Sequence, residues 1–162
     1  MHVAAIADRR NGRLHIFDLH RLSPLHDVEV GAGAYPVDQV GPDLVYVSTR
    51  DVESIRPVQV TTGEAFAPIP LSHKPRSTAW DDARALALVA GADKVQVSVL
   101  DVASGDIVQT VGSGESDLRT DYGGSLACGH PALGPNGEIP LLDRIARRSE
   151  TYAGGGTKRI AT

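Results

Sequence analysis

Short apolar runs separated by turn residues recur along the chain and predict β-strands. The clearest are Val3–Ala7, Leu44–Thr49 and Ala85–Ala90. In Val95–Leu100 apolar and polar residues alternate, which is the period of a half-buried strand. No stretch keeps a 3.6-residue apolar period over the roughly 11–18 residues that a helix prediction needs, and the best candidate, Leu141–Arg148, makes only about two turns. The pattern therefore predicts an all-β chain.

These runs belong to an internal repeat. Asp8, Asp51 and Asp93 follow the three runs and lie 43 and 42 residues apart. Each is followed by another strand, a turn and an outgoing strand; the strands expected after the aspartates are Leu14–Leu19, Ile55–Val60 and Val95–Val102, and the outgoing strands are Asp27–Val30, Phe66–Leu71 and Ile107–Val111. A proline then opens the next unit, at Pro36, Pro75 and Pro131. A fixed period of about 40–45 residues is typical of propeller blades.

The repeat predicts a partial β-propeller, favoured over a β-sandwich, with about three to three-and-a-half four-stranded antiparallel blades in an open arc. The blades are expected within residues 1–153, at 1–35, 36–74, 75–125 and 126–153, and residues 154–162 are expected to form a flexible tail. The third unit is longer than the second, which indicates a polar, Gly-rich loop insertion at 112–124. In the fourth unit, strands are expected near Ile139–Leu142 and Ser149–Tyr152.

Two segments resemble the YVTN-type propeller family. Tyr46-Val47-Ser48-Thr49 resembles the Tyr-Val-Thr-Asn signature, and Gly41-Pro42-Asp43 resembles the Pro-Asp turn before it. Val97–Gly105 is similar to that family's third strand and turn. The resemblance covers roughly residues 1–145 and implies a fold, whereas it implies little about function because the repeat marks structure. Such propellers close with about seven blades and usually carry a signal peptide. From the sequence as given, neither feature is expected here.

Composition and charge limit the classes of partner and the cellular location that the sequence favours. The net charge of -4 gives no general attraction to nucleic acid or anionic membranes, and no apolar run of about 18 residues predicts a membrane span. Met1–Asp8 does not read as a signal peptide, which favours a cytoplasmic location as written, or a periplasmic or secreted one if the chain is an N-terminally truncated family member. The single cysteine, Cys128, excludes an internal disulfide.

Histidine is the only residue type that suggests chemistry. His73 and His130 precede Pro75 and Pro131, at the start of inner strands that line a propeller's channel. Imidazole suits copper or zinc, and the N-terminal domain of nitrous-oxide reductase is similar in placing histidines at channel-facing positions. The pair is thus a candidate copper site in a metal-dependent oxidoreductase, or in a remnant of one. Against this, the two are out of register by one residue and fall short of three or four ligands, which favours ordinary turn histidines.

The repeated aspartates admit two interpretations, an acidic ring for Ca²⁺ or catalysis, and structural turns in which Asp side chains bond the following backbone. The second is favoured. With no catalytic residue or cofactor assigned, the sequence predicts a binding scaffold for a protein or small ligand, with 112–124 as the contact element. An open arc would also expose apolar faces at its first and last blades. The chain is therefore expected to be a fragment, or to complete a ring by self-association or with a second chain.

Overall fold

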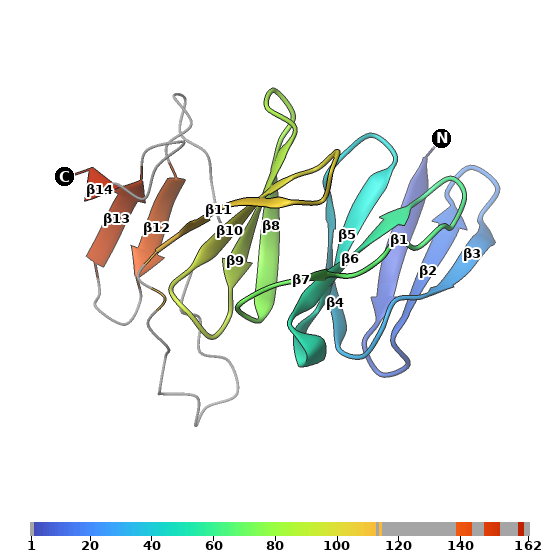
Figure 1. Cartoon of the computed structure of the whole chain (residues 1–162). Helices are drawn as coiled ribbons and strands as arrows, with labels where there is room; N and C mark the ends of the chain where they lie inside the picture. Colours follow the sequence, from blue (N-terminus) through green and yellow to red (C-terminus); the bar gives the residue numbers. More distant parts are fainter. Residues whose placement is uncertain (1, 113, 115–138, 144–147, 153–158, 161–162) are drawn as a thin grey trace. The chain divides into compact units, whose positions relative to one another are not determined.

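The computed structural model describes residues 2–112, 114, 139–143, 148–152 and 159–160. They form four antiparallel sheets and one short 3₁₀ turn (Figure 1), so the all-β prediction is confirmed. The chain divides into two compact units, Met1–Pro75 and Arg76–Thr162. Each unit is described by itself.

The first unit holds two meanders, in which strands that follow one another along the chain are hydrogen-bonded neighbours. Sheet 1 has the order β1-β2-β3 and sheet 2 the order β4-β5-β6-β7. The strands of sheet 1 are β1 (Val3–Asp8), β2 (Arg13–Asp18) and β3 (Ser23–Glu29). Those of sheet 2 are β4 (Ala34–Gln39), β5 (Leu44–Thr49), β6 (Ser54–Gln59) and β7 (Ile69–Pro70), and the 3₁₀ turn η1 (Arg50–Val52) joins β5 to β6.

The second unit repeats this arrangement. Sheet 3 contains β8 (Pro75–Asp81), which starts at the last residue of the first unit, then β9 (Leu86–Gly91), β10 (Val97–Asp101) and β11 (Ile107–Val111). Sheet 4 contains β12 (Ile139–Asp143), β13 (Arg148–Tyr152) and β14 (Arg159–Ile160). Because β14 pairs with β13, part of the segment expected as a tail is a strand.

Prolines explain where strands depart from the expected bounds. Pro36 lies inside β4, not before it, at a register shift between Ala34 and Val37. A bulge tolerates a residue that has no N–H to donate. The outgoing strand expected over Phe66–Leu71 shrinks to β7, since Pro68 and Pro70 cannot donate to the ladder.

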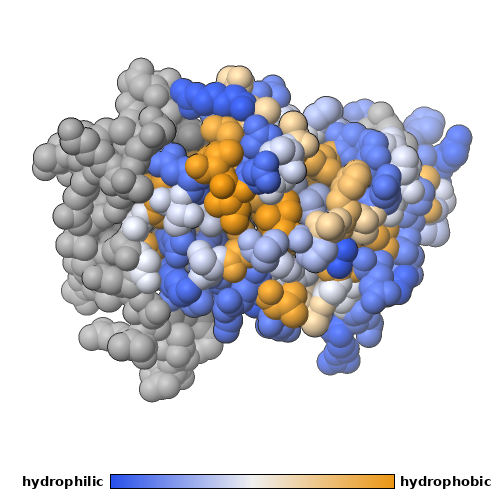
Figure 2. All heavy atoms as spheres, viewed as in Figure 1, coloured by the Kyte–Doolittle hydropathy of each residue, from blue (hydrophilic) through white to orange (hydrophobic). Residues whose placement is uncertain are grey.

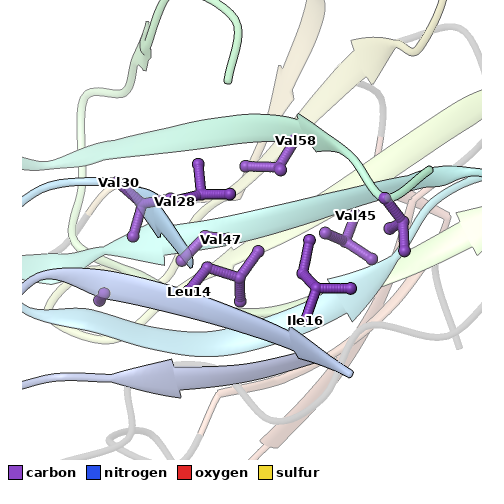
Figure 3. Packing of buried hydrophobic residues seen from close by; sticks show 9 residues of the cluster. Leu14, Ile16, Val28, Val30, Val45, Val47 and Val58 are labelled. Atoms are coloured by element: carbon purple, nitrogen blue, oxygen red, sulfur yellow. The ribbon is translucent and has the colours of Figure 1, made fainter. Parts of the chain in front are cut away.

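The core of the first unit lies between sheets 1 and 2. Leu14 and Ile16 alternate along β2 with half-buried residues and are fully buried. They pack with Val28 and Val30 from sheet 1 and its C-terminal end, and with Val45, Val47 and Val58 from sheet 2 (Figure 3). Burying a Val or Leu side chain contributes about 1.5–3 kcal/mol, so neither sheet is expected to be stable without this contact.

Sheet 3 has its own buried cluster, which includes Leu88, Val97 and Val99. Its edge strand β11 is less covered: Ile107 and Val108 are 41% and 57% exposed, and Figure 2 shows hydrophobic residues at the surface around β11. Only Gly112 and Gly114 of the predicted 112–124 insertion lie within the described residues.

Candidate functional site

The recurrent Asp8 closes the β1–β2 turn. Its Oδ1 accepts hydrogen bonds from the backbone N–H groups of Arg10 and Asn11, both at 3.0 Å, and its Oδ2 accepts one from the Asn11 side chain at 2.6 Å. This is the geometry that the turn interpretation predicts. Asp51, one period later, lies in η1 and packs against Gly33, where an added Cβ would come within 2.6 Å of the Asp51 Cγ.

A second set of turn carboxylates escaped the sequence analysis. Asp18 Oδ1 accepts from the backbone of His20 and Arg21, and Asp101 Oδ1 accepts from that of Ala103 and Ser104. Asp18 is the last residue of β2 and Asp101 is the last residue of β10. Gln59, the last residue of β6, holds the equivalent place in sheet 2. The signal was present, because positions 18, 59 and 101 lie 41 and 42 residues apart.

These hydrogen bonds tune the acidity of the carboxylates. The Asn11 side chain, followed by backbone N–H groups, holds the pKa of Asp8 below its usual value. The N–H of Arg21 lowers the pKa of Asp18, and the N–H of Ser104 lowers that of Asp101. A general acid needs a raised pKa, so these three aspartates suit structural turns better than acid catalysis.

A cavity of about 660 Å³ opens between sheets 1 and 2. Val3 and Ala5 of β1 line one wall, and Val37 of β4 and Val45 of β5 line the opposite one. Polar groups gather beside them, contributed by His2, Gln39, Asp43 and Thr61. Such a size is within the usual range of small-molecule sites, about 300–1,000 Å³.

Asp43 is the charged residue of this cavity. Its Oδ1 accepts from the Thr61 backbone N–H at 2.9 Å, and its Oδ2 accepts from the Gln59 side chain at 3.0 Å and from the Thr61 hydroxyl. The Thr61 hydroxyl, with smaller help from Gln59 and the Thr61 N–H, lowers the pKa of Asp43 despite its partial burial. The carboxylate is therefore ionised at neutral pH.

Of the two predicted metal ligands, only His73 can be placed. It is fully buried between β7 and β8, and its Nδ1 lies 3.4 Å from the Lys74 carbonyl oxygen. His130 lies outside the described residues, as does Cys128. Within the described part of the chain, no three His, Cys, Asp or Glu side chains are grouped as a metal site.

The first blade was expected to expose an apolar face. The face of sheet 1 that is turned away from its core carries charged side chains as well as apolar ones. Arg13 Nε lies 2.5 Å from Asp27 Oδ1, and His15 lies between Asp27 at 3.4 Å and Asp8 at 3.9 Å. Ile6, which pairs with His15 across the strands, is 55% exposed on the same face. Charged side chains on an exposed sheet limit uncontrolled pairing.

Comparisons with known proteins support a propeller fold. Neither a protein-family model nor a curated protein matches the chain. Among solved structures, hydrazine synthase from Kuenenia stuttgartiensis is similar at 15% identity over 97% of this chain and 41% of its own, with a TM-score of 0.69. The WD40 β-propeller domain of Doa1 is similar at 15% identity over 97% and 48%, with a TM-score of 0.65. The computationally designed Ika4 protein is similar at 12% identity over 96% and 87%, with a TM-score of 0.71.

The chain thus spans less than half the length of hydrazine synthase and of the Doa1 chain. At these identities the likeness concerns the fold alone. Together with the repeated meanders, it identifies the fold as part of a β-propeller. No helix among the described residues is long and apolar enough to cross a bilayer.

Proposed function

We propose that the chain is a β-propeller module, with blades of the YVTN type, that binds a protein or a small ligand and catalyses no reaction. The observation that supports this most is the engagement of its aspartates. The carboxylates of Asp8, Asp18 and Asp101 accept hydrogen bonds from backbone N–H groups in turns, and their pKa values are lowered. A repeat whose carboxylates stabilise turns forms a rigid scaffold, and its loops can then bind a partner.

The contact element of the proposed module is the 112–124 insertion. The test is affinity capture with the purified chain as bait, compared with a variant in which residues 113–123 are replaced by a short Gly-Ser linker. We expect a partner that is enriched on the intact chain and lost on the variant. As a matched control, Leu22→Ser alters an exposed turn elsewhere and should keep the partner. Equal capture by all three baits would overturn the role of the insertion.

The same proposal includes self-association, or a second chain, to complete the ring. Sheet 1 has three strands where sheets 2 and 3 have four, and β1 is one of its two edge strands. An unpaired edge and a partly apolar face favour addition of another strand or sheet. Ile6 is the exposed apolar residue that such a neighbour would cover.

A metal-dependent oxidoreductase built on His73 and His130 is the second candidate. The favouring observation is the complete burial of His73 at the start of sheet 3, because imidazole nitrogen is a common ligand of copper and zinc. Metal analysis of the purified chain tests it. The proposal requires copper or zinc that disappears in the double variant His73→Ala plus His130→Ala. Metal well below one equivalent, unchanged in that variant, would refute it.

A further inference from the structure

The cavity between sheets 1 and 2 combines an apolar wall with a carboxylate, and the turns of the fold do not require this combination. Val3, Val37 and Val45 form an apolar part of its wall, and the Asp43 carboxylate lies in the polar part beside them. All of its described lining residues belong to the first unit.

The charge of Asp43 has no cationic partner among the described residues. Its three hydrogen-bond donors come from Thr61 and Gln59, which are neutral. No ion pair of 4.0 Å or less joins it to a described Lys, Arg or His, in contrast to Asp27, which is paired with Arg13. A carboxylate has about four acceptor positions, so three donors leave one open.

We propose that this cavity binds a small organic cation, an amine with an apolar body. The ammonium group would donate to the open acceptor position of Asp43, and the hydrocarbon would lie against Val3, Val37 and Val45. A charge-assisted hydrogen bond to a partly buried carboxylate is stronger than one between neutral groups. An anion of the same shape would meet the Asp43 charge, and a neutral analogue would lack the ion pair. This inference deepens the proposed binding function by naming a ligand class for one site.

The alternative is that Asp43 serves only the fold, since it ties the β4–β5 turn to Thr61. The two roles separate when the charge is removed and the shape is kept. Asp43→Asn retains an oxygen that accepts from the Thr61 N–H, whereas it loses the negative charge. A purely structural Asp43 would give ligand binding that does not depend on ligand charge.

The experiment is isothermal titration of the full chain with three probes of matched size: 2-phenylethylamine, 2-phenylethanol and 3-phenylpropanoate. We expect the amine to bind at least about tenfold more tightly than the alcohol, and the carboxylate not to bind. Asp43→Asn should reduce amine affinity by about tenfold or more, and Asp106→Asn, at an exposed carboxylate of the second unit, should leave it unchanged.

A second variant guards against misfolding of the first. Ala5→Leu keeps Asp43 but adds three carbon atoms to the β1 wall of the cavity, so it should also weaken amine binding. Similar binding of all three probes, or amine binding that survives both variants, would overturn the inference. Because affinity capture by the 112–124 insertion does not involve Asp43, failure here leaves the proposed scaffold role standing, and failure there leaves this site standing.

Discussion

Leu22, Gly63 and Gly105 occupy equivalent places in three successive turns, and all three have a left-handed backbone, with φ of 51°, 73° and 78°. In the second and third turns, the glycine N–H donates to the carbonyl of the residue four positions earlier, Gln59 or Asp101, at 2.9 Å. Glycine adopts this conformation without a steric penalty, whereas the same conformation destabilises the chain at Leu22 by about 1–2 kcal/mol.

Gly63 has a further constraint, and this gives a residue-scale prediction. A Cβ there would lie 2.7 Å from His26 Cγ, and the His26 ring holds the Thr61 carbonyl through Nε2 at 2.9 Å. Gly63→Ala should therefore lower the free energy of unfolding by about 2–3 kcal/mol, combining backbone strain with a displaced imidazole. Urea unfolding measures it.

Gly114→Ala is the matched control, since Gly114 has a similar φ of 69° and no atom of another described residue lies within 4 Å of the added Cβ. Its cost should be only the backbone strain of about 1 kcal/mol. Equal losses in the two variants would show that the His26 contact is unimportant.

At the same scale, the sequence revealed turns but not the cavity. Asp8 could be assigned because its partners lie two and three residues away. Asp43 depends on Thr61, 18 residues along the chain, so its environment appears only once β5 and β6 are paired. The sequence placed Asp43 in a turn and gave no sign of a pocket.

At the scale of elements, strands were predictable wherever local pattern decides them. β5 and β11 have the expected bounds, and β12 extends one residue past its expectation. β7 was overestimated because apolar character was weighed above the two prolines, and β14 was missed because two residues carry no periodicity.

The packing of sheet 1 on sheet 2 is the contact that defines neighbouring blades, and Leu14 tests it. Leu14→Ala removes a fully buried side chain of that core and should cost about 3 kcal/mol of unfolding free energy. Leu22→Ala, at an 84% exposed side chain, should cost no more than about 0.5 kcal/mol. Comparable effects of the two substitutions in urea unfolding would contradict the packed arrangement.

For the whole molecule, the turn aspartates set the response to acid. Asp8, Asp18, Asp43 and Asp101 all have pKa values lowered by hydrogen bonds in the folded chain. Their stabilisation is complete above the unfolded-state value of about 3.9 and is lost as the pH falls through the folded-state values. The free energy of unfolding should therefore fall below about pH 4.

A pH series of urea unfolding curves measures this slope. Asp101→Asn removes one proton-binding group and should flatten it, while keeping an oxygen that accepts from Ala103 and Ser104. An unchanged slope in that variant would mean that Asp101 gains nothing from its turn.

The central claim is that this chain is part of a propeller and that another strand or sheet packs against its first sheet. Light scattering across a range of protein concentrations tests it most directly. We predict a mass that rises above the monomer with concentration, and Ile6→Lys should shift it back because a charge then lies on the open face of sheet 1. Leu22→Lys, at an even more exposed side chain but in a turn, should not. A well-folded monomer at every concentration, binding no hydrophobic dye, would contradict the claim.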